Sequence, residues 1–252
     1  NVWCAAGKGT FGTDEIVRQV QRTQLDQVVR HRKLIVPQLG ATGVAGRQVK
    51  KRSGFEVVWG PIQARDIKAF LAAGQKADQT MRRVTFTFLE RLVLVPVELS
   101  LLRKYLLWTL AALFVSSGVG SAIFSLTAAW QRGLLAVTAF IAGIVAGCVL
   151  VPAFLPWIPG RAFAFKGALM GLILGLASVA SLWASPLVSG WPAVAMLLLS
   201  MAASSFLAMN FTGSTPFTSP SGVEKEMRRA IPLQLIAIVL AAGLWVGTAF
   251  VT

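Results

Sequence analysis

Five long apolar segments follow Lys104, and they constrain the fold more than any other feature of the chain. Each is long enough to cross about 30 Å of hydrocarbon, which takes about 20 helical residues. None contains Asp, Glu, Lys or Arg, and tryptophans stand near several of their ends, as is typical of the membrane interface. The sequence therefore predicts an all-α membrane domain of five transmembrane helices over residues 105–252. The expected spans are residues 105–124, 133–155, 167–185, 191–211 and 231–251.

The density of charged residues also drops after Lys104. Residues 1–104 hold 18 of the 24 Lys and Arg residues and 8 of the 10 Asp and Glu residues. If this part is cytoplasmic, five spans leave Arg132 as the one basic residue outside, which satisfies the positive-inside rule. We expect a multi-pass protein of the cytoplasmic (inner) membrane, with its N-terminal domain in the cytoplasm and its C-terminus outside.

Small residues recur at helical spacing in two of the expected spans. Gly143 and Gly147 form one G-x-x-x-G pair, and Gly167, Gly171 and Gly175 extend the pattern in the third span. Such spacing lets helix backbones approach closely. Packing within the chain is the favoured interpretation, and oligomerisation is the alternative. Because no charged residue or broken helix marks a transport site in these spans, the domain is interpreted as an anchor or platform.

Residues 1–104 show alternating helical and extended patterns, which favour a parallel α/β sheet. Thr13 is a candidate cap for a helix that begins with Asp14 and Glu15 and reaches about Arg30. Ligands of such sheets bind beyond the carboxyl ends of the strands. The other expected elements are strands at Lys33–Pro37, Phe55–Trp59 and Arg83–Leu89, a flexible glycine loop at Gly40–Gly46, a helix near Ala64–Ala73 and a juxtamembrane stretch at Glu90–Lys104.

Several more specific chemistries are disfavoured. The basic residues are not interleaved with aromatic ones, so a nucleic-acid partner is not expected; an anionic leaflet or an acidic protein fits them better. Gly7–Gly12 matches G-x-G-x-x-G, but it lacks the preceding strand and the later acidic residue of a dinucleotide site. The single histidine, His31, lies in a basic cluster and is expected to be a solvated surface residue.

Cys4 is the candidate for special chemistry. It stands between Trp3 and the small residues Ala5, Ala6 and Gly7, so a large flat group can approach its sulfur. Three readings stay open from the residues alone: a buried structural thiol, a disulfide, which a cytoplasmic setting disfavours, and a metal ligand or nucleophile. Lys8 and a helix N-terminus would favour the thiolate.

The segment Asn-Val-Trp-Cys-Ala-Ala-Gly-Lys, at residues 1–8, resembles the cap-helix signature of the mercury-methylation corrinoid protein family (HgcA). Further segments resemble that family: Phe55–Pro61, Arg91–Leu99 and Asn210–Gly222. The family joins a corrinoid domain, related to the corrinoid iron–sulfur protein of the acetyl-CoA pathway, to five membrane spans. The resemblance implies a partial Rossmann-like corrinoid-binding domain over residues 1–104. Since the residues upstream of the signature are absent, we expect an N-terminally truncated fragment.

The resemblance also assigns roles to residues. Cys4 would be the lower axial ligand of the cobalt in a cobalamin-type corrinoid. The rest of the cap would lie against the macrocycle: Asn1, Val2, Trp3, Ala5, Ala6, Gly7, Lys8, Gly9 and Thr10. Weaker candidates for contacts with the ring or its tail, with simple turns as the favoured alternative, are Gly40, Gly43, Gly60 and Pro61.

The implied activity is a corrinoid-dependent methyltransferase reaction of anaerobic one-carbon metabolism. Methyl–cobalt(III) would pass its methyl group to Hg(II) and form methylmercury, with the Cys4 thiolate donating electrons from below. The methyl group would come from a methyl-folate route, and a ferredoxin-like iron–sulfur partner would re-reduce the cobalt. Two alternatives remain: a membrane-anchored corrinoid methyl carrier that does not act on mercury, and a non-catalytic membrane scaffold in which Cys4 is structural.

Overall fold

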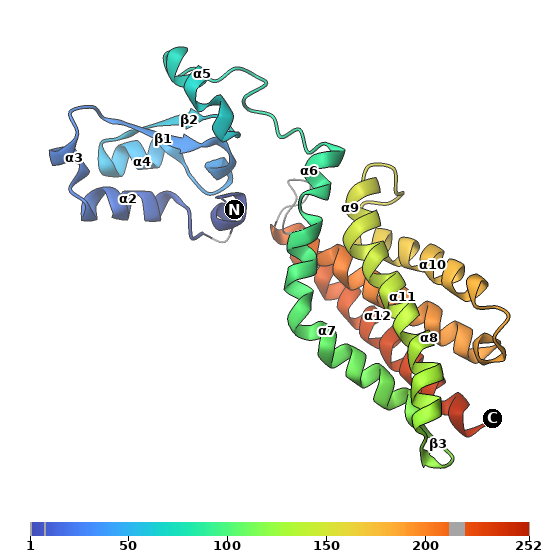
Figure 1. Ribbon diagram of the computed structural model, residues 1–252. Coiled ribbons are helices and arrows are strands. Elements are labelled where there is room, and N and C mark those ends of the chain that lie inside the picture. Colours follow the sequence, from blue (N-terminus) through green and yellow to red (C-terminus); the bar gives the residue numbers. More distant parts are fainter. Residues whose placement is uncertain (1, 8, 212–219, 252) are drawn as a thin grey trace. The chain divides into compact units, whose positions relative to one another are not determined.

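The computed structural model describes residues 2–7, 9–211 and 220–251, apart from the side chains of Trp3, Cys4, Gly7, Pro220 and Ser221. The described chain is mostly helical and forms two compact units (Figure 1). The first unit consists mainly of residues up to Thr85, and the second mainly of residues from Phe86 onward. The division falls earlier than the expected boundary at residues 104 and 105, because the chain becomes helical well before its long apolar run begins.

The first unit is built around a parallel pair of strands, β1 (Lys33–Pro37) and β2 (Glu56–Gly60). The helix α4 (Gly46–Ser53) connects them, so the three elements form one β-α-β unit. This is a small sheet, and a full Rossmann-like sheet is not seen in the described residues. The remaining elements are α1 (Val2–Gly7), α2 (Thr13–Arg22), α3 (Leu25–Val28), the 3-10 helices η1 (Gln38–Thr42) and η2 (Ala64–Asp66), and α5 (Ile67–Ala72).

The strand predictions at Lys33–Pro37 and Phe55–Trp59 are confirmed to within one residue, and the helix expected from Asp14 is confirmed as far as Arg22 but does not continue unbroken to Arg30. It ends at Arg22, because Gln24 adopts a left-handed backbone with φ of 47°. Thr13 is not the cap. Gly12 holds that position, and the Thr13 hydroxyl instead accepts a hydrogen bond from the Ala45 N–H at 2.8 Å.

Two further predictions for the N-terminal part need correction. The loop expected at residues 40–46 is shorter, because the residues up to Thr42 belong to η1 and Gly46 begins α4. The strand expected at Arg83–Leu89 is absent from the described structure, because Thr87 begins the helix α6 (Phe88–Leu92). The Thr87 hydroxyl accepts from the Glu90 N–H, and the Glu90 carboxylate accepts from the Thr87 N–H at 2.7 Å, which completes a capping box.

The second unit contains five helical segments that are long and apolar enough to cross a membrane. They are Phe88–Gly118, Leu126–Phe154, Phe163–Ser181, Trp191–Asn210 and Gly222–Phe250. The number of spans is as predicted. The first span is misplaced, because residues 119–124 form a small hairpin of β3 (Val119–Gly120) and β4 (Ile123–Phe124). The helices within the spans are α7 (Val95–Gly118), α8 (Leu126–Ile144), a π-helical segment at Val145–Leu150, α9 (Val151–Phe154), α10 (Phe163–Ser181), α11 (Trp191–Asn210) and α12 (Pro220–Gly247), which contains Pro232.

Several helices of the second unit begin before the expected spans and therefore include charged residues, although the expected spans themselves contain none. Two of them are buried near the end of α9. Arg91 donates to the backbone oxygens of Phe86 and Ala153, both at 3.1 Å, and Lys166 donates to the backbone oxygen of Leu155 at 2.6 Å. Because carbonyls at a helix C-terminus lack partners within the helix, these two cations stabilise the end of α9.

The helix α11 lies between α8 and α10, and the glycines of both neighbours permit its close approach. A β-carbon added at Gly147 would lie 2.7 Å from the Ser204 backbone oxygen, and one added at Gly171 would lie 2.7 Å from that of Ser200. Both distances are shorter than real β-carbon contacts. The interpretation of these glycines as packing positions within the chain is therefore confirmed.

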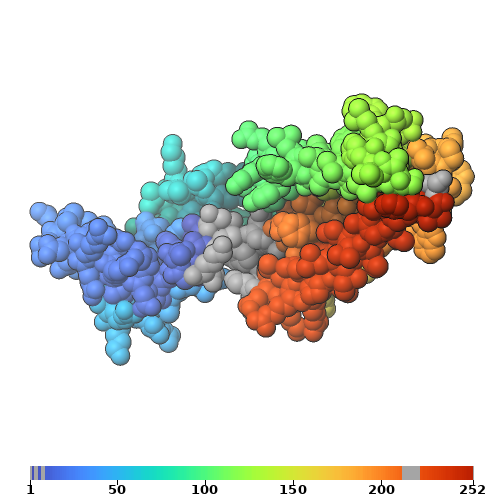
Figure 2. Space-filling model, turned by 90° about the horizontal axis from the view of Figure 1, so that it is seen from below, coloured from blue at the N-terminus to red at the C-terminus, as the bar shows by residue number. Residues whose placement is uncertain are grey.

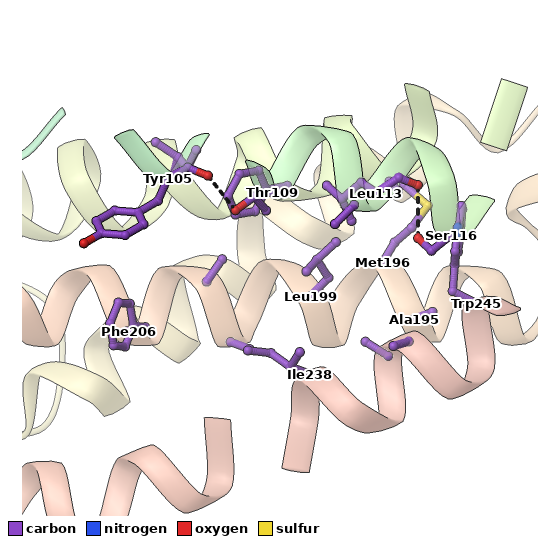
Figure 3. A pocket seen from close by; sticks show the side chains of 18 of the residues that line it. Tyr105, Thr109, Leu113, Ser116, Ala195, Met196, Leu199, Phe206, Ile238 and Trp245 are labelled. Carbon is purple, nitrogen blue, oxygen red and sulfur yellow. Dashed lines mark hydrogen bonds between the residues drawn. The ribbon is translucent and has the colours of Figure 1, made fainter. Parts of the chain in front are cut away.

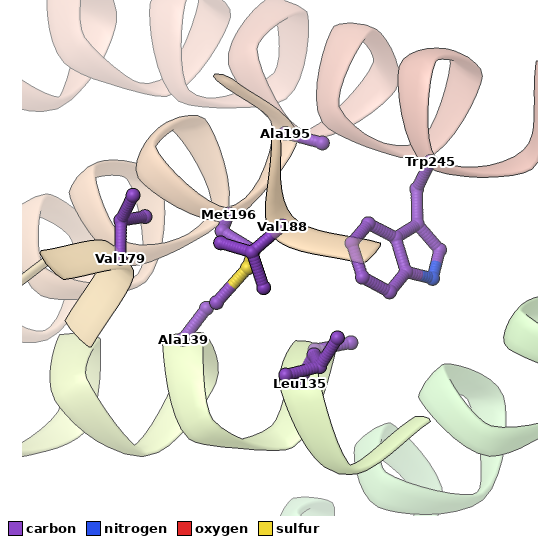
Figure 4. Close-up of a cluster of buried hydrophobic side chains, with 8 residues drawn as sticks. Leu135, Ala139, Val179, Val188, Ala195, Met196 and Trp245 are labelled. Carbon is purple, nitrogen blue, oxygen red and sulfur yellow. The ribbon is translucent and has the colours of Figure 1, made fainter. Parts of the chain in front are cut away.

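A hydrophobic cluster fills the bundle between α8, α10, α11 and α12 (Figure 4). Trp245 enters it from α12, and its indole N–H donates to Ser117 Oγ on α7 at 2.8 Å. The Arg132 guanidinium lies 5.0 Å from the Trp245 ring centroid, so the same residue also links α8 to α12. The outer face of α12 stays exposed along much of its length, as Figure 2 shows, and carries Leu233, Ile236, Val239 and Leu240.

Candidate functional site

The carboxyl edge of the strand pair is the candidate site in the first unit. The strands are in register, with Pro37 opposite Gly60, so both end at the same edge. The chain enters η1 directly after β1, and α1 packs against η1. Ligands of parallel sheets bind beyond the carboxyl ends of their strands. The helix that carries Cys4 therefore lies at the edge of the sheet where a ligand is expected.

A tight turn fastens α1 to this edge. Ala6 is buried, and its backbone oxygen accepts from the Gly9 N–H at 3.2 Å. The backbone oxygen of Ala5 accepts from the Phe11 N–H at 3.0 Å and from the Thr10 hydroxyl at 3.1 Å. Gly9 has φ of 76°, the left-handed conformation in which helices commonly end. The end of α1 is therefore held by its own backbone bonds.

Gly43 and Gly40 allow that turn to dock. A β-carbon on Gly43 would lie 2.6 Å from the backbone oxygen of Ala6, and one on Gly40 would lie 2.6 Å from the Phe11 ring. The Thr13 N–H donates to the Gly43 backbone oxygen at 3.2 Å and closes the contact from the other side. Gly40 and Gly43 therefore lie beside Ala6 and Phe11. These two residues fill the space that larger side chains at the glycine positions would need.

Gly60 and Pro61 lie at the end of β2, and both are buried. A β-carbon on Gly60 would meet the Ile35 side chain at 3.1 Å. Directly after them, the Ile62 N–H donates to the backbone oxygen of Met81 at 2.9 Å. These two residues shape the edge by packing between β1 and the segment around Met81.

Cys4 lies in the middle of α1. Because an α-helix turns about 100° per residue, position 4 stands on the side of the helix opposite position 6, which faces η1. The side chains of Trp3, Cys4 and Gly7, and the whole of Asn1 and Lys8, fall outside the described residues. Val2 and Ala5 are half-buried, while Gly9 and Thr10 are exposed.

The histidine of the first unit lies away from this edge. His31 precedes β1, at the opposite end of the strand from Pro37, and is exposed as expected. Its Nδ1 accepts from the Lys33 N–H at 3.5 Å. Among the residues that the structure describes, no group of three or more His, Cys, Asp or Glu side chains is arranged to hold a metal ion. The second cysteine, Cys148, is buried in the π-helical segment of the membrane unit.

Sequence reasoning missed Phe11 and Thr13 as parts of this site. Phe11 packs its ring against Gly40, and Thr13 binds both Gly43 and Ala45 through its backbone N–H and its hydroxyl. These contacts join residues about 30 positions apart in the chain. The one available signal was the glycine spacing of residues 40–46, which indicated a turn but not its partner.

The membrane unit contains an apolar cavity of about 540 Å³ between α7, α8, α11 and α12 (Figure 3). The Thr109 hydroxyl donates to the backbone oxygen of Tyr105 at 3.0 Å, and the Ser116 hydroxyl donates to that of Leu113 at 3.1 Å. Both hydroxyl groups are thus satisfied within α7. The cavity therefore offers apolar contact, as to a lipid chain, and we assign no chemistry to it.

The five apolar helices define a multi-pass membrane protein with a small α/β unit at its N-terminal end. No protein-family model matches the chain, and neither a curated protein nor a solved structure matches it.

Proposed function

We propose that the protein is a membrane-anchored, corrinoid-dependent methyltransferase that transfers a methyl group to Hg(II). Cys4 would be the lower axial ligand of the corrinoid cobalt. The observation that carries the proposal is the position of α1: the helix with the resemblance to the cap-helix signature is fixed at the carboxyl edge of a parallel strand pair. The five apolar spans agree with the membrane domain that the resemblance implies.

The donor set fits a corrinoid. The macrocycle supplies four nitrogen ligands to its cobalt, so the protein needs to provide one ligand at most. Cys4 in α1 provides one thiol, whereas His31 lies at the far end of β1. The small side chain of Ala5, which directly follows Cys4, adds little bulk where a flat ring would approach the helix.

The role of the chain is to bind and orient. When bound, the corrinoid supplies the methyl-carrying metal. The Phe11 and Gly9 N–H groups donate to the backbone oxygens of Ala5 and Ala6 and fix the end of α1, the helix that carries Cys4. A thiolate is the form of cysteine that binds metals, so Cys4 must lose its proton to act. Cys4 would hold the cobalt, and its strongly donating thiolate would favour transfer of the methyl group to a soft electrophile such as Hg(II).

The orientation and partners belong to the same proposal. The distribution of basic residues supports a cytoplasmic N-terminal unit and an outside C-terminus in the cytoplasmic membrane. The reaction requires a methyl donor, for which a methyl-folate route is proposed, and an electron donor. A ferredoxin-like iron–sulfur protein is the proposed source of electrons.

The test compares Cys4→Ala with Cys148→Ala, which removes the other cysteine of the chain. Both variants are assayed in membranes with Hg(II), a methyl donor and a reductant, and the corrinoid absorption spectrum of each is recorded. Cys4→Ala should abolish methylmercury formation and shift the spectrum, while Cys148→Ala should change neither. Wild-type activity in Cys4→Ala would refute the axial-ligand assignment. A corrinoid spectrum without any methylmercury from the wild-type protein would favour a methyl carrier that does not act on mercury.

A further inference from the structure

A second cavity, of about 970 Å³, lies between α10, α11 and α12 in the membrane unit. Its lining changes from charged to apolar. The charged part comes from the residues before α10 and from the first turns of α12, and it includes Arg161, Lys225 and Arg229. The apolar part lies further along the helices and includes Phe165, Met201, Ala202, Leu233 and Ala237. The site is therefore amphipathic.

The charged part carries an excess of positive charge. Its one lining carboxylate, Glu226, accepts a hydrogen bond from the Ala164 N–H at 2.6 Å and is thus directed at the N-terminus of α10. Within the described ranges, Arg161, Lys225 and Arg229 form no ion pair. Three cations against one engaged carboxylate favour an anionic ligand.

The amide oxygen of Gln234, beside the apolar part of the cavity lining, has no hydrogen-bond partner in the described structure. Gln234 lines the cavity and is 6% exposed. Its amide nitrogen, in contrast, donates to Ser205 Oγ at 2.8 Å. Buried polar atoms are almost always hydrogen-bonded. A ligand that brings a hydroxyl or N–H donor to this part of the cavity would satisfy the amide oxygen.

We propose that this cavity binds an anionic phospholipid with a free hydroxyl in its head group, such as phosphatidylglycerol. The phosphate contacts Arg161, Lys225 and Arg229, the hydroxyl donates to the Gln234 amide oxygen, and an acyl chain lies on the apolar lining. Basic pockets between transmembrane helices are known to bind anionic head groups. The charged first turns of α12 then serve as a lipid-binding element. The proposal does not depend on methyl transfer.

Phospholipid is a better match than free phosphate because apolar residues make up most of the lining. A soluble anion would leave that surface uncovered, whereas a lipid covers both parts at once. The cavity is formed by membrane helices, so bilayer lipids are its immediate neighbours. Lipid is thus the occupant that the surroundings supply.

The test uses the purified full chain in detergent, with lipid binding measured by native mass spectrometry. Each basic residue near an anionic lipid contributes about a fivefold change in affinity. Arg229→Gln should therefore weaken phosphatidylglycerol binding about fivefold, and the combined Arg161→Gln, Lys225→Gln and Arg229→Gln variant should weaken it about a hundredfold. Arg228→Gln is the matched control, because Arg228 pairs with Glu224 and does not line the cavity. Equal binding by the Arg228 and Arg229 variants would overturn the proposal.

Lipids with different head groups test whether binding depends on the negative charge and on the hydroxyl of the head group. Phosphatidylglycerol should bind more tightly than phosphatidylcholine, which has no net charge, and than phosphatidylethanol, which has the same charge but no head-group hydroxyl. Gln234→Leu should remove the preference over phosphatidylethanol and keep the preference over phosphatidylcholine. If inorganic phosphate alone displaces the bound lipid or binds as tightly, the site is for a soluble anion and the proposal fails. Circular dichroism of each variant verifies that its helices are intact.

Discussion

Ser204 Oγ on α11 donates a 2.6 Å hydrogen bond to the backbone oxygen of Gly167 on α10. One turn away, Ser200 Oγ donates to the Gly171 backbone oxygen at 2.9 Å. Both serines are buried, so each bond satisfies a hydroxyl that lipid would leave unpaired. The two bonds form because the glycines let the helix backbones come close enough for a short side chain to reach.

The first prediction concerns this contact. Gly171→Ala places a β-carbon 2.7 Å from the Ser200 backbone oxygen, so the helices must separate and the Ser200 bond must lengthen. Overpacking of this kind costs about 1–3 kcal/mol. Thermal unfolding in detergent should therefore show a lower Tm. Gly243→Ala, on α12, is the control, because its β-carbon meets nothing within 4 Å. Equal Tm values for the two variants would contradict the packing described for α10 and α11.

The second prediction concerns the docking of α1. Gly43→Ala places a β-carbon 2.6 Å from the Ala6 backbone oxygen, which cannot move without displacing the helix. The Phe11 N–H donates to the Ala5 backbone oxygen and is protected while α1 is docked. A loss of about 1.4 kcal/mol in the stability of the docked state corresponds to a factor of ten. This N–H should therefore exchange with solvent at least about tenfold faster in Gly43→Ala. Gly12→Ala is the control, with its nearest contact at an ordinary 3.4 Å. Unchanged exchange in Gly43→Ala would show that α1 is not held through Gly43.

The third prediction concerns pH. The pKa of Asp78 is lowered, chiefly because its carboxylate accepts from the Met81 N–H at 2.7 Å and also because it accepts from the Thr80 hydroxyl at 2.8 Å. A depressed pKa means that the carboxylate stabilises this turn fully above the ordinary Asp value of about 3.9. That stabilisation is lost as the pH falls through the lower folded-state pKa.

Nuclear magnetic resonance can follow this titration through the Met81 amide. Its shift should change with a midpoint below the ordinary Asp pKa, and Asp78→Asn should remove the change while keeping an acceptor oxygen in place. A midpoint at or above the ordinary value would contradict the two hydrogen bonds to the carboxylate.

The membrane helices were predictable from the sequence, because a run of apolar residues is sufficient to define a span. Several of their ends were not. Charged residues such as Glu98 and Arg132 continue the helix, and hydropathy does not register the hydrogen bonds that hold them there. The Arg132 side chain, for example, donates to Thr248 Oγ1 at 3.1 Å, a partner 116 residues away in the chain.

Local signals explain part of what was missed in the N-terminal unit. The capping box of Thr87 and Glu90 is visible as T-x-x-E, and it would have replaced the strand expected at Arg83–Leu89 by a helix start. The contacts of Gly40 with Phe11 and of Gly43 with Ala6 had no such signal. The pairing of Gln234 with Ser205 also depends on how α11 and α12 pack, and no pattern within either helix predicts it.

Pro232 lies inside α12, between Arg229 and Gln234. A proline lacks the N–H that would otherwise bond to the carbonyl four residues earlier, here that of Arg228. The helix can therefore bend at this point, and its charged first turns can tilt without disturbing the turns that carry Trp245. A lipid bound to both Arg229 and Gln234 would contact α12 on either side of Pro232. Loss of the lipid would make α12 more flexible at Pro232, and rebinding of the lipid would make α12 more rigid there.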